Sequence, residues 1–317
     1  MTTYKEIFGK YVKNYSSDPT SDIEGQIWYN STSGTFKTNL VGAAAWASGG
    51  NLATARQSPA GAGTQTAGLV FAGLTTVNVA NTEEYDGSAW TGGGNMGTAR
   101  YVLGGAGTQT AGLAFGGNSG SLTTATEEYD GSAWTGGGNM GTARRLLGGA
   151  GTQTAGLGFG GFITTVQSVT EEYDGTSWTA GGALATARYG PAGAGTQTAG
   201  LGAGGYTTTS VANTEEYDGT SWTGGGNLNT ARFGAAAGTQ TAGLCFGGFA
   251  TANTNATEEY NGTSWTNSTN MGTSRRNLAG AGIQTAGLAA AGLTTVNTAA
   301  TEEYSDPSFS TETITTS

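Results

Sequence analysis

The acidic pairs of this chain are its first candidates for chemistry. A Glu-Glu-Tyr triplet occurs in six copies, and paired carboxylates serve general acid and base catalysis. The triplets begin at Glu83, Glu127, Glu171, Glu215, Glu258 and Glu302. One active site does not need six copies in one frame. We therefore expect one glutamate of each pair to bind a repeated arginine and the other to face water, with a calcium or substrate role as the alternative. No catalytic residue is predicted.

The residues or the sequence context needed for several other common catalytic, metal and dinucleotide sites are absent from the sequence. The chain has no histidine, which excludes Ser-His-Asp and Cys-His catalysis and metal sites with imidazole ligands. Its one cysteine, Cys245, aligns with Val70 and Ala114 of other repeats, so we expect a small buried side chain. The stretch GGGNMG at 92–97 fits G-x-G-x-x-G but lacks the strand-then-helix context that a dinucleotide site needs, since no helix is expected after it. No metal or cofactor is predicted.

Charge restricts the partners. The formal net charge is −10, and the four lysines all lie in the first 40 residues, where four acids balance them. The rest of the chain therefore carries the negative charge, which repels nucleic acid and anionic membranes. No run of 18 apolar residues is present, and the first residues lack the apolar region of a secretory signal. We expect neither nucleic-acid binding nor membrane insertion.

Three markers recur in fixed order with a spacing of 44 residues and one deletion near Ala237. The first is GTQTAGL, which begins at Gly63, Gly107, Gly151, Gly195 and Gly238 and returns as GIQTAGL at Gly282. The Glu-Glu-Tyr triplet follows. The third is Trp, at positions 46, 90, 134, 178, 222 and 265, with Arg ten residues after each. Six copies of one structural unit are predicted.

Each unit is predicted to be a four-stranded sheet. Helical repeats are excluded, because each unit is rich in glycine, which costs about 1 kcal/mol per helix-interior position relative to alanine. In the second unit we predict strands a, b, c and d around 101–107, 110–117, 124–130 and 132–137. The Asp-Gly between strands c and d predicts a tight hairpin turn in which both residues have positive φ. The predicted fold class is all-β, and radially arranged sheets of this size are typical of a propeller.

The repeat resembles the kelch motif. The shared features are a diglycine ending strand b (Gly116, Gly117), Tyr129-Asp130 ending strand c, Trp134 in strand d and Arg144 after it. The resemblance implies a six-bladed β-propeller over 41–304. The first Trp strand precedes the first complete set of strands, so we expect the strand of Trp46 to complete the last blade, with Phe309 as the competing candidate for that place.

Positions that differ between the copies predict the binding face. The residue after the diglycine and the residue after the repeated Arg both vary, and both belong to connections on one face of a four-stranded blade. The large aromatic residues in these sets are Tyr101, Phe162, Tyr189, Tyr206, Phe233 and Phe249. Such rings suit contact surfaces, including the stacking of sugars. The alternative is that some of them fill space between blades.

Residues 1–40 lie outside the repeat. The stretch GQIWYNSTSGTFK at 25–37 resembles a short segment common in bacteriophage tail-fibre and other virion appendage proteins. It predicts a hairpin arm, with QIWYN and TFKTN flanking the turn STSG. The arm residues expected to be exposed and adhesive are Ile27, Trp28, Tyr29 and Phe36. A tail is expected at 305–317.

The resemblance implies a non-enzymatic virion protein, located in a phage tail or appendage. Its partners would be other virion proteins through the arm, and a host surface glycan or protein, or a neighbouring virion subunit, through the variable face. Symmetric homo-oligomers are usual for appendage proteins. The alternatives are a cellular kelch protein that scaffolds other proteins, and a carbohydrate-active enzyme that uses carboxylates alone.

Overall fold

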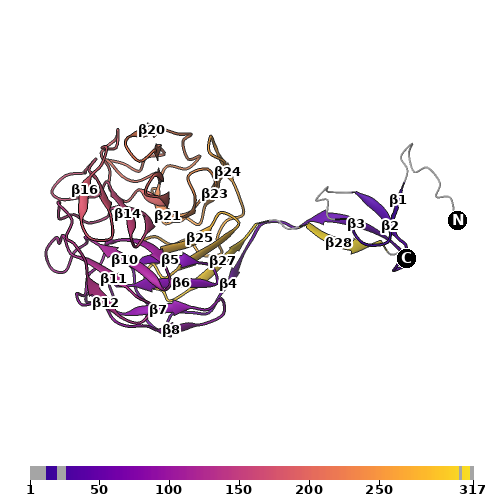
Figure 1. The fold of residues 1–317 in the computed structure, drawn as a ribbon, viewed down its shortest axis with the longest axis horizontal. Coiled ribbons are helices and arrows are strands. Elements are labelled where there is room, and N and C mark those ends of the chain that lie inside the picture. Colours follow the sequence, from indigo (N-terminus) through magenta and orange to yellow (C-terminus); the bar gives the residue numbers. More distant parts are fainter. Residues whose placement is uncertain (1–11, 20–25, 307–308, 315–317) are drawn as a thin grey trace. The chain divides into compact units, whose positions relative to one another are not determined.

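The computed structural model describes residues 12–19, 26–306 and 309–314 (Figure 1). The described residues form two compact units. Ala45–Ser305 is one, here called the repeat unit, and the described residues before and after it form the arm unit. Every regular element within the described residues is a β-strand. The protein is therefore all-β, as predicted.

Within the described residues, the repeat unit consists of four-stranded antiparallel sheets, which is consistent with a β-propeller. Sheet 1 contains β5 (Ala60–Thr64), β6 (Ala67–Phe71), β7 (Thr82–Tyr85) and β8 (Trp90–Gly92). Sheet 2 contains β9 (Gly104–Thr108), β10 (Ala111–Phe115), β11 (Thr126–Tyr129) and β12 (Trp134–Gly136). Sheet 3 contains β13 (Gly148–Thr152), β14 (Ala155–Phe159), β15 (Thr170–Tyr173) and β16 (Trp178–Ala180). In each sheet these are strands a, b, c and d in order.

The next two sheets repeat this order. Sheet 4 contains β17 (Ala192–Thr196), β18 (Ala199–Ala203), β19 (Thr214–Tyr217) and β20 (Trp222–Gly224). Sheet 5 contains β21 (Phe233–Gly238), β22 (Gly243–Phe249), β23 (Thr257–Tyr260) and β24 (Trp265–Asn267). Strand β21 carries an irregularity between Phe233 and Ala235, where the sequence has its deletion.

Sheet 6 joins the two ends of the repeat unit. It contains β25 (Ala279–Ile283), β26 (Ala286–Ala290), β27 (Thr301–Ser305) and β4 (Ala45–Ser48). Strand β4 is antiparallel to β27, with Trp46 opposite Tyr304. The predicted pairing of the Trp46 strand with the last set of strands is confirmed. Phe309 is not in this sheet, because its strand pairs in the arm unit.

The a strands lie side by side around a common centre. Each contacts the a strand of the next sheet, and β25 contacts β5 (Figure 1). Glycine permits this close approach, since a Cβ on Gly149 would lie 2.4 Å from the carbonyl oxygen of Gly105. The glycine content that excluded a helical repeat is therefore needed where the sheets meet.

Tryptophan holds neighbouring sheets together. Trp134 of sheet 2 packs between Tyr129 of its own sheet and Phe71 of sheet 1, with ring centroids 5.0 and 4.8 Å apart. Its indole Nε1 donates to Thr82 Oγ1 of sheet 1 at 2.8 Å. The same indole bond joins each sheet to the one before it. The pairs are Trp46–Thr257, Trp90–Thr301, Trp134–Thr82, Trp178–Thr126, Trp222–Thr170 and Trp265–Thr214.

The glutamine of GTQT explains why this turn barely changes. Gln109 Nε2 of sheet 2 donates to the carbonyl oxygens of Gly68 and Tyr85 in sheet 1, at 3.1 and 2.7 Å. Its counterparts are Gln65, Gln153, Gln197, Gln240 and Gln284, each bonded in the same way to the preceding sheet. An invariant turn residue thus links neighbouring sheets.

The turn between strands c and d differs from the prediction. Only its glycine has positive φ, at 91° for Gly87, while Asp86 does not. Asp86 Oδ1 instead accepts hydrogen bonds from the backbone N–H groups of Ser88 and Ala89, both at 2.8 Å. The prediction of two positive φ angles was wrong, because the aspartate side chain caps a four-residue loop rather than adopting the left-handed conformation.

The arm unit is a four-stranded sheet in the order β1-β2-β3-β28. Its strands are β1 (Lys13–Tyr15), β2 (Ile27–Asn30), β3 (Thr35–Val41) and β28 (Phe309–Thr313). The predicted hairpin is confirmed, with STSG joining β2 to β3, although Gly25 of the motif lies outside the described residues. Two further strands were not predicted from the sequence. Strand β1 runs parallel to β2, and β28, from the predicted tail, is antiparallel to β3.

Candidate binding face

Two variable sets of residues meet at one end of each sheet. The residue after the repeated Arg pairs with the residue after the diglycine, as Tyr189 does with Tyr206 and Arg145 with Phe162. In sheet 5 the equivalent pair is Phe233 with Phe249. The loops that join b to c, and d to the next a, therefore lie together. We call this end of the sheets the loop face.

Five of the six predicted aromatic residues contact one another on the loop face. Tyr189 and Tyr206 stack with centroids 5.0 Å apart, and Phe233 and Phe249 stack at 5.6 Å. Phe162 meets Tyr189 edge-on at 5.8 Å. Phe233 joins the two groups, at 6.2 Å from Tyr189 and 6.4 Å from Tyr206. We call these five residues the aromatic arc.

Tyr101 is the predicted face residue that lies apart. It pairs with Asn118 in sheet 2, and within the described residues no ring contact joins it to the arc. In sheet 1, the next sheet on the side away from the arc, the equivalent pair is Gln57 and Leu74, and neither residue has a ring. The arc therefore covers sheets 3, 4 and 5, while the loop face of sheets 1 and 2 has no equivalent cluster.

Two arginines bracket the arc, and the sequence analysis missed both as site residues. The Cζ atom of Arg145 lies 5.5 Å from the ring centroid of Phe162, and that of Arg276 lies 5.1 Å from Phe249. Both distances fit cation–π contacts. The available signal was the doubled arginine, because each is the second residue of an Arg-Arg pair.

The arc residues and both bracketing arginines are half-buried. Burial raises the pKa of the Tyr189 phenol, Tyr206 raises it further and Arg145 opposes the shift. Gly190 leaves room for the arc, because a Cβ there would lie 3.3 Å from the Cβ of Phe233. The rings thus have one side packed on the sheets and a remainder open to a partner.

Beside the arc lies a small central pocket of about 130 Å³. Residues with left-handed backbone form part of its wall, and Val102 and Leu146 are among them, with φ of 50° and 55°. Backbone hydrogen bonds link them in series, from Val102 N to Ser58 O and from Leu146 N to Val102 O. Gly190 N continues the series to Leu146 O. Sheet 5 lacks the corresponding residue, so Phe233 and Gly234 line the pocket instead.

The acidic pairs are not part of the aromatic arc and have structural partners. The first glutamate binds the repeated arginine in its own sheet, as Arg144 Nη1 binds Glu171 Oε1 at 2.6 Å. All six arginines of this set are fully buried. The pairs are Arg56–Glu83, Arg100–Glu127, Arg144–Glu171, Arg188–Glu215, Arg232–Glu258 and Arg275–Glu302. The expected arginine partner is confirmed.

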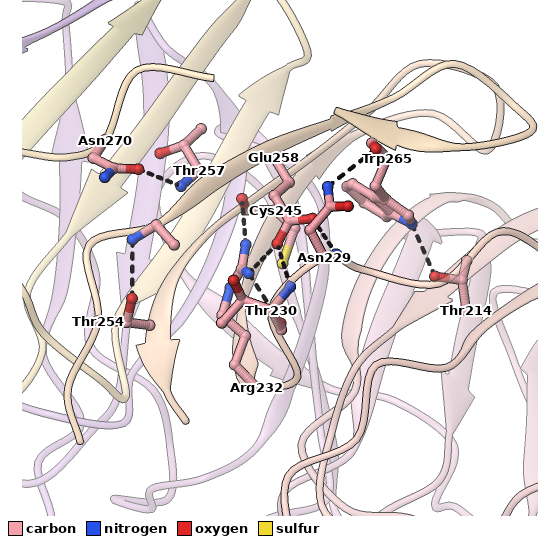
Figure 2. Close-up of polar contacts among 11 residues, drawn as sticks. Thr214, Asn229, Thr230, Arg232, Cys245, Thr254, Thr257, Glu258, Trp265 and Asn270 are labelled. Atoms are coloured by element: carbon pink, nitrogen blue, oxygen red, sulfur yellow. Dashed lines mark hydrogen bonds and ion pairs between the residues drawn. The ribbon is translucent and has the colours of Figure 1, made fainter. Parts of the chain in front are cut away.

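Figure 2 shows one such centre in sheet 5. Arg232 binds Glu258 and also donates to the carbonyl oxygen of Cys245 at 3.1 Å. Glu258 accepts further hydrogen bonds from the backbone N–H groups of Asn229 and Thr230. Cys245 itself is fully buried, and burial raises the pKa of its thiol. Its expected place in the core is confirmed.

The second glutamate of each pair does not simply face water, so that expectation was wrong. It accepts a hydrogen bond from the tyrosine of the next sheet, as Glu84 does from Tyr129. The tyrosine-to-glutamate pairs are Tyr85–Glu303, Tyr129–Glu84, Tyr173–Glu128, Tyr217–Glu172, Tyr260–Glu216 and Tyr304–Glu259. Each phenol also accepts a backbone N–H or meets a hydroxyl, as Tyr129 accepts from Gly94. The expectation failed because the carboxylate reaches across to a neighbouring sheet.

The arm residues are less exposed than predicted. Trp28 is fully buried, and its Nε1 donates to Asp18 Oδ1 at 3.1 Å, so its prediction as an exposed adhesive side chain was wrong. Lys37 also binds Asp18, and Tyr29 packs on Phe36 with centroids 5.2 Å apart. Ile27 and Phe36 remain exposed, by 43% and 37%. The missed strand β1 and the loop carrying Asp18 supply the cover that a two-stranded arm would lack.

The described residues contain no cluster of three acidic or thiol side chains arranged to hold a metal ion. No helix among them is long and apolar enough to cross a membrane. The chain matches no protein-family model, and no curated protein matches it. The case for a function therefore depends on the loop face and the arm.

Proposed function

We propose that this chain is a non-enzymatic virion protein of a phage tail or similar appendage, which binds a partner through its loop face. The repeat unit would be a six-bladed kelch-type β-propeller closed by β4. The partner would be a host surface glycan or protein, or a neighbouring virion subunit. The arm unit would attach the protein to other proteins of the particle, where it would form a symmetric homo-oligomer.

One observation carries the binding role. Five half-buried aromatic residues from three adjacent sheets contact one another on the loop face, and most of them replace smaller or polar residues of other sheets. The buried contacts between sheets recur with little change, so the sheet scaffold does not require rings at these places. Clustered aromatic residues are typical of binding surfaces.

A second observation supports attachment at the other end of the repeat unit. The chain enters sheet 6 at Ala45 and leaves it at Ser305, and these two residues are paired. They lie where the other sheets have their c–d turns, at the end opposite the loop face. The connections to the arm unit therefore begin at the end of sheet 6 that is opposite the loop face.

The ion pairs and hydrogen bonds made by the glutamates of the Glu-Glu-Tyr triplets support a non-enzymatic role. Both glutamates of the triplets have structural partners, and these partners recur from sheet to sheet. A carboxylate used for acid or base catalysis would differ in its surroundings from its counterparts.

Binding and stability must be measured on the same variants. Replacing Phe162, Tyr206 and Phe249 by Ala is expected to abolish adsorption of the labelled full-length protein to host cells or particles while the melting temperature stays nearly unchanged. The matched control replaces Leu74, Asn118 and Leu293, the equivalent residues of the other three sheets, by Ala. Equal adsorption by both triple variants would refute the binding role of the arc.

Location requires a separate experiment. Mass spectrometry of purified particles is expected to detect the chain, and electron microscopy of the isolated protein should show six sectors around a centre. Recovery of the chain in a cytosolic complex, with none in particles, would favour the cellular scaffold instead. A count of five or seven sectors would refute the proposed blade number.

A further inference from the structure

The loop face of the repeat unit has an unusual distribution of charge. Every carboxylate of the repeat unit lies on a c strand or in a c–d turn, so the loops of the loop face contain no acidic residue. The repeat unit has no lysine or histidine, and its positive charges are eight arginines. Six of them are buried in ion pairs with glutamate. Arg145 and Arg276 are the remaining two.

These two guanidinium groups have no carboxylate partner in the described residues. Arg276 makes a long hydrogen bond of 3.4 Å to Asn253 Oδ1, and Arg145 makes no side-chain hydrogen bond to a described residue. Each instead lies over a ring at one end of the aromatic arc. A guanidinium on an aromatic ring keeps N–H donors free to bind a carboxylate in a planar, two-pronged arrangement.

Between the two arginines, the surface is apolar and hydroxylated. The arc supplies five rings, two of them phenols, and the adjacent b–c loops carry exposed threonines. The exposed threonines of these loops are Thr164, Thr165, Thr208, Thr209 and Thr251. Rings suit the C–H faces of sugars, and hydroxyl groups exchange hydrogen bonds with sugar hydroxyls. No charge other than the two arginines interrupts this stretch.

We infer that the aromatic arc binds an acidic saccharide chain, with Arg145 and Arg276 each holding a carboxylate of the ligand. The inference rests on the proposed binding function of the loop face and specifies its ligand. A chain of sugar rings with repeated carboxylates matches both the apolar stretch and the positive charge at its two ends. An acidic protein segment supplies the charges but not the hydroxylated rings between them.

The test measures binding of the full-length protein to paired probes by calorimetry or a saccharide array. The acidic probes are oligogalacturonate and an oligomer of sialic acid. Their neutral counterparts are the methyl esters of the same two oligomers, and polyglutamate supplies carboxylates without sugar rings. At least one acidic saccharide should bind much more tightly than its neutral counterpart and than polyglutamate, and added salt should weaken that binding.

The variants assign the binding to named residues. Arg145→Gln and Arg276→Gln should each weaken binding of the acidic saccharide about tenfold, as expected for the loss of a charged hydrogen bond. The double variant should bind the acidic and neutral probes alike. Gln57→Ala and Asn118→Ala, on the loop face of sheets 1 and 2, are matched controls and should bind as the unmodified protein does. Circular dichroism verifies that every variant is folded.

Three results would overturn the inference. They are binding to no acidic saccharide, equal binding to acidic and neutral members of a pair, and tighter binding of polyglutamate than of either saccharide. If acidic and neutral saccharides bind equally and the arc triple variant binds neither, the inference of an acidic ligand is wrong but the proposed function is not refuted. Adsorption to cells or particles that survives the arc triple variant would instead refute the proposed function itself.

Discussion

The contacts between sheets and the residues of the loop face follow opposite rules. Between sheets, a tryptophan, a glutamine and a tyrosine make the same hydrogen bonds from one sheet to the next. On the loop face, the same two positions hold Tyr and Tyr in sheet 4 but Gln and Leu in sheet 1. Sheets that pack side by side need every junction to fit, whereas the loops at one end of a sheet have fewer neighbours to match. The repeated contacts therefore serve the stability of the sheets, and the varied positions are where the proposed partner would bind.

Alkaline titration should give the largest effect, because it acts on all tyrosine-to-glutamate contacts together. Burial, followed by the glutamate acceptor, raises the pKa of five phenols to about 12, from an ordinary value of 10.0. These are Tyr85, Tyr129, Tyr173, Tyr217 and Tyr260. A raised folded-state pKa means that their contribution to stability is complete below pH 10 and is lost as the pH rises through about 12.

Unfolding of the repeat unit and ionisation of these five tyrosines should therefore coincide in an alkaline titration. Circular dichroism reports the first and tyrosinate absorbance reports the second. Ionisation of these phenols near pH 10 in a protein that stays folded would contradict the contacts described between sheets.

Removal of one buried carboxylate should have the next largest effect. Glu258→Ala leaves the guanidinium of Arg232 without its anionic partner in a fully buried site. An uncompensated buried charge of this kind costs about 3–5 kcal/mol. Denaturant unfolding measures the loss, and Asp218→Ala, at an exposed turn, is expected to lose much less. Equal losses in the two variants would argue against the buried pair.

Truncation of a junction tryptophan should be similarly severe. Trp134→Ala removes ring contacts with Phe71 and Tyr129 and the hydrogen bond to Thr82. Truncation of a large aromatic side chain in a core costs about 3–5 kcal/mol, and this ring is only partly buried, so the lower end of that range is expected. Trp222→Ala, at a more buried position, should cost more under the same denaturant titration. A larger loss of unfolding free energy in Trp134→Ala than in Trp222→Ala would show that burial of the ring does not determine the loss.

Replacing one glycine between two sheets should test how sheet 6 differs from the other sheets. A Cβ on Gly138 would lie 2.0 Å from the carbonyl oxygen of Thr176, in the c–d turn of sheet 3. Gly138→Ala should therefore lose about 1–3 kcal/mol, as overpacked sites do. The corresponding residue before sheet 6 is the exposed Thr269, because β27 and β4 have no turn between them. Thr269→Ala should change the free energy of unfolding by less than about 0.5 kcal/mol.

Only a small effect on stability is expected on the loop face. Phe162→Ala, Tyr206→Ala and Phe249→Ala remove half-buried rings at the ends of the sheets. Each should change the unfolding free energy by less than about 1 kcal/mol, well below the loss at Trp134. Thermal melts of the single variants measure this. A loss as large as that of Trp134→Ala would show that the arc is part of the core. The loop face would then not differ from the contacts between sheets.

Much of the repeat could be predicted because its signals are local. Glycine content, the position of Trp and the order of the markers fixed the strands, and the surplus strand at Trp46 predicted the pairing with β27. The arginine partner of the first glutamate followed from repetition. The expectation of two positive φ angles in the Asp-Gly turn was wrong because the aspartate side chain stabilises the turn by accepting backbone hydrogen bonds.

The candidate site could be predicted only in part. The variable positions identified the aromatic residues. Arg145 and Arg276 were not predicted, because their role depends on two arginines being left over once the other six pair with buried glutamates. Trp28 was misjudged because its indole binds Asp18 and its strand pairs with β1, both outside the hairpin. Unlike the error at the turn, these two errors concerned a partner in another segment of the chain.

The sequence by itself determined the repeated strands, the order of the sheets and the residues that vary between them, since all of these are patterns along one chain. The tertiary structure alone decided which varied residues become neighbours. It brought Phe233 between Tyr189 and Phe249 and left Tyr101 apart. The physical reason is that contacts across sheets depend on the direction of side chains and on the packing of neighbours, which a one-dimensional period does not encode.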